Sequence, residues 1–127
     1  MTGYSGNIEE ITLENTNFRQ VLFTGKFCQL VAMDLKVGEE IGMEVHEKVD
    51  QFFRFEKGQG KVIIDNDEYE VGDGSAIIVP AGSNHNVVNT SQDQSLKLYT
   101  IYSPPNHPDG TVHKTKEEAE VYEKSHH

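Results

Sequence analysis

Hydrophobic residues are grouped along most of this chain in short segments, each only a few residues long and rich in Val, Ile, Leu, Phe and Thr. From about Ile8 to Tyr102 these segments alternate with turn-forming groups such as 56–60, 71–75 and 80–84. No segment in this region combines helical length with a helical period. The pattern predicts an all-β fold, an antiparallel sandwich or barrel built as a single domain.

Two of the predicted strands can be assigned an inner and an outer face, because successive side chains of a strand point to opposite sides. In 51–56, Gln51 shares a face with Phe53 and Phe55, while the opposite face carries two charged residues. We therefore expect Gln51 to point inward together with the two phenylalanines. For 96–102 we expect the inner face to carry Leu96, Leu98, Thr100 and Tyr102.

The pattern changes after Tyr102. Three of the four prolines fall in 103–114, a segment that we expect to lack regular structure. Thr115 is followed three residues later by Glu118, which is the spacing of a capping box and predicts a short helix over 116–124. The terminal His126 and His127 are either native or a cloning remnant.

These boundaries give one domain over 1–127. We divide it into a mobile N-terminus (1–7), the barrel proper (36–102) and a proline-rich tail with a short helix (103–127).

Composition and charge exclude several classes of function. The net charge of −10, from 21 acidic and 11 basic side chains, would repel a phosphate backbone, so we expect no nucleic-acid partner. No apolar run approaches the roughly 20 residues that span a bilayer, and the N-terminus lacks the features of a signal peptide. We therefore expect no membrane association and a cytoplasmic location. The single cysteine, Cys28, is expected to be a small buried side chain.

Four polar residues form the candidate chemistry: Glu44, His46, Gln51 and His85. Glu44 and His46 are two apart and would leave the same face of a strand, and the charged turn 47–50 would bring Gln51 back beside them. Four polar side chains directed into an apolar interior would each be costly alone, whereas one shared cation would satisfy them together. Spacing alone leaves open the other interpretation, in which these residues are solvated or bonded to their own loops.

Two stretches of the chain resemble the two conserved motifs of the cupin superfamily. The second stretch matches its motif at every defining position, reading Gly74-x5-Pro80-x-Gly82-x2-His85-x3-Asn89. The first stretch has the spacing of its motif, reading Gly38-x5-Glu44-x-His46-x4-Gln51-x6-Gly58. It departs from the usual ligands, because the family has His, His and Glu where this chain has Glu44, His46 and Gln51.

The resemblance implies an antiparallel, jelly-roll-like cupin β-barrel that holds one divalent metal ion at Glu44, His46, Gln51 and His85. The ion could be Mn, Fe, Zn, Ni or Co, because a set of imidazole, carboxylate and amide ligands does not choose among them. Residues on the inner faces would form the wall of the pocket: Phe53, Phe55, Val87 and Leu98. His107 and His113 in the tail are expected to be solvated or loop-bonded rather than a second metal site.

The function implied is that of a metal-dependent enzyme acting on a small polar molecule, as an isomerase of the sugar or sugar-phosphate type or as a dioxygenase. The alternative is a non-catalytic cupin that binds a small ligand and uses the metal for structure. Cupins commonly pair, and the exposed faces of 52–56 and 96–102 offer a surface for it, so we also expect a homodimer.

Overall fold

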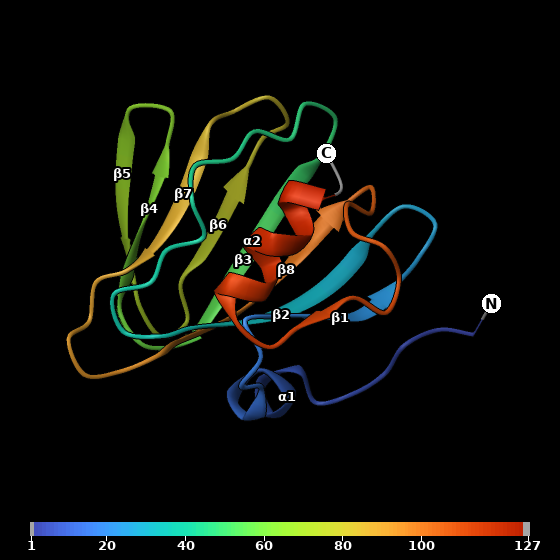
Figure 1. Cartoon of the computed structure of the whole chain (residues 1–127), viewed down its shortest axis with the longest axis horizontal. Coiled ribbons are helices and arrows are strands. Elements are labelled where there is room, and N and C mark those ends of the chain that lie inside the picture. Colours follow the sequence, from blue (N-terminus) through green and yellow to red (C-terminus); the bar gives the residue numbers. More distant parts are fainter. Residues whose placement is uncertain (1, 126–127) are drawn as a thin grey trace.

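The computed structural model describes residues 2–125 and is mostly antiparallel β-structure (Figure 1). The terminal His126 and His127 lie outside the described residues. The elements, in chain order, are α1 (Ile8–Glu14), β1 (Arg19–Thr24), β2 (Gln29–Leu35), β3 (Asp50–Lys57), β4 (Gly60–Ile64), β5 (Asp67–Val71), β6 (Ala76–Val79), β7 (His85–Asn89), β8 (Leu96–Ser103), β9 (Val112–His113) and α2 (Lys116–Ser125). Neither helix has the length or hydrophobicity of a bilayer-spanning segment.

The strands form two sheets. The larger sheet has six strands in the order β6-β3-β8-β2-β1-β9, and the smaller has three in the order β5-β4-β7. Every strand pair within them is antiparallel. The all-β antiparallel prediction is confirmed, although the hydrogen bonds of residues 2–125 leave two sheets rather than one closed barrel.

One hydrophobic core joins the two sheets. It includes Phe53 and Leu98 from the larger sheet and Val62 and Val87 from the smaller one, all completely buried. We call the face of the larger sheet that enters this core its inner face. Along β3 and β8 buried residues alternate with partly exposed ones, and the buried set is the one expected to point inward.

The loop between β2 and β3, residues 36–49, runs along the free edge of β7. The backbone N–H of Ile41 donates to the carbonyl oxygen of Val87 at 2.9 Å, and Glu44 and His85 exchange two backbone hydrogen bonds. We expected Glu44 and His46 on a regular strand. Instead only isolated bridges form here, because positive φ angles at Gly38 and Gly42 turn the backbone away from a continuous ladder.

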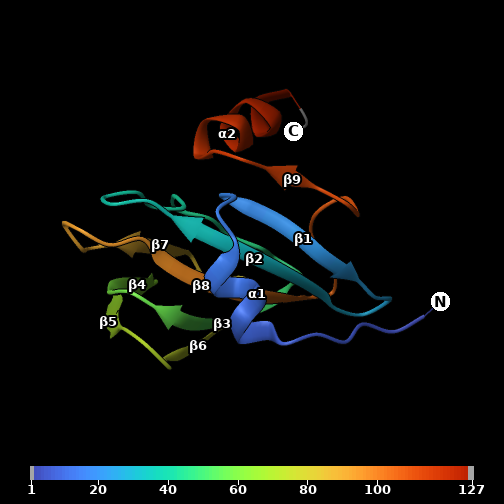
Figure 2. The same cartoon turned by 90° about the horizontal axis from the view of Figure 1, so that it is seen from below.

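The helix α1 was not predicted. Its N-cap is Asn7, whose side-chain oxygen accepts a hydrogen bond from the backbone N–H of Glu10 at 3.0 Å. The helix packs against β8, β3 and β2 of the larger sheet (Figure 2). At seven residues it is too short to display a period, so only the capping residue and the acidic first turn could have indicated it.

The predicted C-terminal helix is confirmed. The backbone N–H of Glu118 donates to the Thr115 hydroxyl at 3.1 Å, and the Glu118 carboxylate accepts from the backbone N–H of Lys114 at 2.6 Å. The tail before it is not wholly irregular, because the short strand β9 pairs with the start of β1. In Figure 2, β9 and α2 lie on the opposite side of β1 and β2 from the smaller sheet.

Cys28 was expected to be buried, and this expectation is wrong. The residue is exposed in the turn between β1 and β2, where its carbonyl oxygen accepts a hydrogen bond from the backbone N–H of Gly25 at 2.8 Å. Cys28 is exposed because it lies in this turn, although the sequence on its C-terminal side is apolar.

Candidate metal centre

The structure brings together three of the four predicted ligands. One ligand atom each from Glu44, His46 and His85 lies within 4.8 Å of the others. Ligands at about 2.0–2.2 Å from a zinc-sized ion are separated by up to roughly 4.4 Å, so a small contraction would allow all three to coordinate one ion. The two histidine rings have their centroids 5.3 Å apart.

Backbone hydrogen bonds hold the three ligand residues next to one another. Glu44 and His85 face each other across an antiparallel bridge, with N–H to oxygen distances of 2.8 and 2.9 Å. A third hydrogen bond, from the N–H of Gly82 to the carbonyl oxygen of His46 at 2.9 Å, joins the loop to the turn before β7. Gly82 has φ of 87°, a conformation that a residue with a side chain rarely adopts.

The two histidines are set up to coordinate through Nε2. His85 has its Nδ1 atom 3.2 Å from the carbonyl oxygen of Ser83, so the neutral ring carries its proton on Nδ1 and leaves the lone pair on Nε2. The Nε2 atoms of His85 and His46 are both buried without a hydrogen-bond partner among the described residues. Buried polar atoms normally find a partner, and a cation would supply one.

Gln51 lies on β3 and is 1% exposed. Its Nε2 donates to the Thr100 hydroxyl at 3.0 Å, and that hydroxyl donates to the carbonyl oxygen of Phe52 at 2.8 Å. These bonds leave Oε1 of Gln51 buried and unpaired in the described part of the chain. An amide oxygen in this state fits the predicted role of a fourth ligand.

The charge of Glu44 is favoured by its surroundings. Burial alone would raise the pKa of Glu44, but interaction with His46 and the charges of Arg19 and His85 hold it below its usual range. Burial also lowers the pKa of His85, which favours the neutral ring. An ionised carboxylate and neutral imidazoles are the forms that bind a divalent ion.

Several other polar groups surround these ligands. The Tyr102 ring meets the His46 ring edge to face at 5.8 Å between centroids, and the Tyr102 hydroxyl is 3.2 Å from Nε2 of His107. Burial raises the pKa of Tyr102 above its usual value. Burial, with the nearby Arg19 charge, lowers the pKa of His107 to about 3. At neutral pH both groups therefore form hydrogen bonds in their uncharged forms.

The predicted pocket wall is buried. Phe53, Phe55, Val87 and Leu98 are all 0% exposed. The Phe53 ring meets the His85 ring at 6.3 Å and stacks near Phe55 at 6.2 Å, so an apolar wall begins directly beside the ligands.

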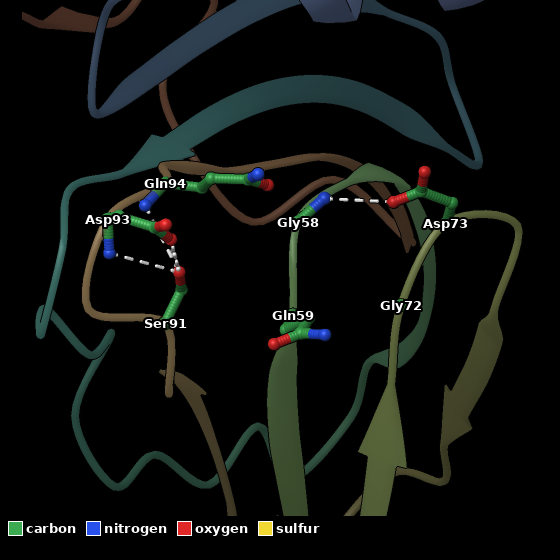
Figure 3. A pocket seen from close by; sticks show the side chains of 7 residues that line it. All are labelled: Gly58, Gln59, Gly72, Asp73, Ser91, Asp93 and Gln94. Atoms are coloured by element: carbon green, nitrogen blue, oxygen red, sulfur yellow. Dashed lines mark hydrogen bonds between the residues drawn. The ribbon is translucent and has the colours of Figure 1, made fainter.

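A separate surface hollow of about 520 Å³ lies next to the C-terminal end of β3 (Figure 3). Gln51 lies near the opposite, N-terminal end of that strand. The hollow is lined by Gly58, Gln59, Gly72, Asp73, Ser91, Asp93 and Gln94. The Asp73 carboxylate accepts from the N–H of Gly58 at 3.0 Å, and the Ser91 hydroxyl donates to Asp93 at 2.9 Å. Because its acids are engaged in supporting the loops, we assign the candidate chemistry to the ligand cluster and not to this hollow.

Arg19 and His107 carry or feel charges that act on this region, and the sequence did not assign them to the site; His113 lies opposite Arg19 on β9. Arg19 is 2% exposed, and its charge acts on Glu44, Tyr102 and His107. The strand period contained the signal for Arg19, because Arg19 and the buried Val21 are two apart and share a face. The two tail histidines were expected to be solvated or loop-bonded. Instead the His107 ring bonds to Tyr102 of β8, and His113 is buried with its ring 5.2 Å from that of Tyr122.

Comparison with known proteins agrees with these motifs. Residues 31–102 match the family model described as a cupin domain. The uncharacterized protein YrkC of Bacillus subtilis is 51% identical over 119 residues, which cover 89% of this chain and 63% of that protein. The uncharacterized protein L612 of Acanthamoeba polyphaga mimivirus is 40% identical over 112 residues, covering 86% of this chain and 70% of that protein. The chain thus spans less than two-thirds of the length of the Bacillus subtilis relative.

The fold is also similar to that of a solved structure. The crystal structure of BH2720 from Bacillus halodurans superimposes with a TM-score of 0.92 at 45% sequence identity, covering 94% of this chain and 95% of that one.

Proposed function

The chain belongs to the cupin family, and from that premise we propose that it binds one divalent metal ion through Glu44, His46, His85 and the amide oxygen of Gln51. The observation that carries this proposal is the convergence of three ligand atoms within 4.8 Å. The Nε2 atoms of His46 and His85 are buried without a hydrogen-bond partner in residues 2–125. Mn, Fe, Zn, Ni and Co all suit such a set. The proposed setting is a cytoplasmic, jelly-roll-like barrel.

We further propose that the ion is the centre of an enzyme acting on a small polar molecule, either an isomerase of the sugar type or a dioxygenase. A bound ion would act as a Lewis acid on a hydroxyl, carbonyl or carboxylate oxygen. The chain's own residues supply orientation: Phe53 forms an apolar wall beside His85, and Tyr102 and His107 offer uncharged hydrogen-bonding groups.

The second candidate is a non-catalytic cupin that binds a small ligand and uses the metal for structure. It is supported by the state of the groups around the ligands. A general acid or base works best with a pKa near the working pH, whereas the pKa of Tyr102 is raised and that of His107 is about 3.

Metal analysis tests the shared part of both candidates. We expect about one equivalent of a divalent ion in the purified protein by mass spectrometry, and its loss in His46→Ala and His85→Ala, because each removes a nitrogen ligand. His113→Gln, a change to a buried histidine outside the cluster, is the matched control and should keep the ion. Wild-type protein that takes up no Mn, Fe, Zn, Ni or Co would refute the proposal.

Two further measurements separate the candidates. Oxygen uptake by the Fe(II)-loaded protein with a panel of small polar compounds would support a dioxygenase, and interconversion of aldoses and ketoses would support an isomerase. A His46→Ala protein that loses metal but keeps its affinity for a ligand found in such a panel would exclude a function centred on the ion.

We also propose that two copies pair through the outer face of the larger sheet. Residues Ile78, Phe52, Ile101 and Leu30 lie opposite one another in register across four strands. Ile78 is 66% exposed, although it is a large apolar residue. We expect a dimer by light scattering and a monomer for Ile78→Asp, with Val121→Asp on exposed α2 as the control. A monomeric wild-type protein would contradict this part of the proposal.

A further inference from the structure

A smaller hollow lies where the start of α2 meets β2, away from the proposed metal ligands. Its volume is about 60 Å³, which leaves room for a few water molecules or one small ion. The residues that line it include Asp34, Lys36, Glu39, Lys114, Thr115 and Lys116. The proposed metal ligands do not line it.

Asp34 is a buried carboxylate that has one oxygen without a partner. Its side chain is only 1% exposed. Lys36 and Lys97 both pair with the same oxygen, Oδ2, at 2.5 and 3.2 Å from their Nζ atoms. The other oxygen, Oδ1, is buried and accepts no hydrogen bond within residues 2–125. Buried acceptors normally have a donor, so we expect a ligand of this hollow to donate a hydrogen to Oδ1.

The lining of the hollow is positively charged, although the whole chain has a net charge of −10. Three lysines and two carboxylates contribute to it, and they leave one positive charge in excess: Lys36, Lys114, Lys116, Asp34 and Glu39. The N-terminal end of α2, a helix of ten residues, adds partial positive charge. These charges favour an anion.

Two acids of α2 lie close to these lysines and are already engaged. The Glu118 carboxylate accepts from the backbone N–H of Lys114 in the cap of the helix. Glu120 pairs with Lys116, but the two atoms are 3.7 Å apart and the Glu120 side chain is 53% exposed. Such an exposed pair is weak, so Lys116 can turn towards an anion.

An anion that satisfies both features must carry a hydrogen, because it has to donate to Asp34 while its other oxygens accept from lysines. We propose that this hollow binds a small oxyanion that retains one hydrogen, such as hydrogen phosphate. Oδ1 of Asp34 accepts that hydrogen, and Lys36 and Lys114 bind the remaining oxygens. The Lys36 side chain is 53% exposed, so it can move to admit the ion. This site is independent of the proposed metal ion.

The test compares hydrogen phosphate with sulfate by calorimetry on the full chain. At about pH 8 both ions are dianions of similar size, and only hydrogen phosphate retains a hydrogen. We expect sulfate to bind at least about tenfold more weakly, because it cannot donate to Oδ1 of Asp34. Methyl phosphate has lost its hydrogen at this pH and should bind as weakly as sulfate. Bicarbonate, which also carries a hydrogen, is titrated as well, and tighter binding than that of phosphate would make it the ligand and keep the role of Asp34.

Asp34→Asn should reverse the preference between the two ions. Lys36 and Lys97 hold an oxygen at the Oδ2 position, so the amide NH2 group takes the position of Oδ1 and donates to the anion. We expect sulfate to gain affinity and hydrogen phosphate to lose it. A purely structural role of Asp34 would instead weaken the binding of both ions alike.

Lys114→Met and Lys124→Met form a matched pair of controls. Each removes one positive charge from an exposed lysine, but only Lys114 lines the hollow. Lys114→Met should weaken hydrogen phosphate binding by about tenfold, whereas Lys124→Met should change it little. His46→Ala removes a proposed metal ligand and should leave the binding of hydrogen phosphate unchanged.

Four results would overturn the proposal. A wild-type protein that binds neither ion has no such site, and one that binds sulfate as tightly as hydrogen phosphate does not use Oδ1 of Asp34. Equal losses in Lys114→Met and Lys124→Met would trace the attraction to the overall charge. Loss of binding in His46→Ala would place the anion at the metal ion. If Asp34→Asn does not fold, as judged by circular dichroism, the comparison of the ions and the two lysine variants decide.

Discussion

At the scale of single residues, the orientation of Gln51 is the detail on which the fourth ligand depends. The Thr100 hydroxyl accepts from Nε2 of Gln51 and donates to the carbonyl oxygen of Phe52. Both Gln51 and Thr100 are almost completely buried. The hydroxyl therefore holds the amide with its NH2 group engaged and its oxygen free.

Replacing Thr100 by valine, which has nearly the same shape, should expose this role. The change removes the hydroxyl that accepts from Nε2 of Gln51, so we expect the free energy of unfolding in urea to fall by about 1–3 kcal/mol. Metal affinity should fall as well, since the amide is free to turn. Thr90→Val, at an exposed threonine, is the control, and equal effects of the two changes would contradict this account.

Side chains on strands were the most predictable from sequence. The inward positions of Gln51, Phe53 and Leu98 follow from the period of two, and the structure confirms them. The burial of Arg19 was not anticipated, although the same period places it beside Val21. A charged residue is normally assigned to solvent, and its counter-ion Glu123 is about a hundred positions away in the sequence.

At the scale of elements, Asn89 connects three parts of the fold. From the end of β7 its Nδ2 atom donates to the carbonyl oxygens of Leu35 and Lys36 at 3.1 Å and of Gln94 at 2.9 Å. Its Oδ1 accepts from the N–H of Ser91 at 2.9 Å. One buried amide thus joins the larger sheet, the smaller sheet and the turn before β8.

We expect Asn89→Ala to reduce the free energy of unfolding by about 2–4 kcal/mol, because one buried and three part-buried backbone groups would lose their partner at once. Urea denaturation monitored by circular dichroism measures this. Asn66→Ala, in the exposed turn between β4 and β5, should change it by less than about 0.5 kcal/mol. A similar loss at both positions would show that Asn89 has no special role.

Elements with a long or repeated pattern were predicted, and short ones were not. The strands and α2 follow from alternation and from a capping box, whereas α1 and β9 span seven and two residues and depend on contacts made by the folded chain. The region around Glu44 was predicted as a strand but forms isolated bridges, because its glycines interrupt the ladder.

At the scale of the whole molecule, the partly buried histidine His107 links stability to pH. Its pKa is lowered from 6.5 to about 3 by burial and by the charges of Arg19, His46 and His113, with Glu44 acting in the opposite direction. In the unfolded chain, His107 therefore becomes protonated as the pH falls through about 6.5, whereas in the folded protein it becomes protonated only near pH 3. The stability that neutral His107 contributes is complete above pH 6.5 and is lost as the pH falls towards 3.

The prediction is that the free energy of unfolding of the metal-free protein falls more steeply between pH 6.5 and pH 4 than that of His107→Gln. One proton accounts for at most about 1.4 kcal/mol per pH unit, which sets the largest possible difference in slope. Urea titrations in the presence of a chelator measure both proteins. Parallel pH profiles would mean that His107 is freely protonated in the folded state.

The cupin family could be inferred from the two motifs alone, because their spacing places the same residue types at the same turns. The family implied an antiparallel barrel, whereas the strands of residues 2–125 pair into two separate sheets. The charged groups around the ligands could not be inferred from the motifs, because they come from the N-terminal strand β1 and from the tail, both outside the motifs.

The bridge between Glu44 and His85 has a kinetic consequence. Two of the ligands belong to the loop 36–49, which is bonded along the edge of β7, and His85 belongs to β7 itself. Peeling this segment from the strand would withdraw Glu44 and His46 together. The residence time of a bound ion would then equal the waiting time for that local opening, and amide protons of Ile41 and Glu44 should exchange with deuterium at a rate that reports it.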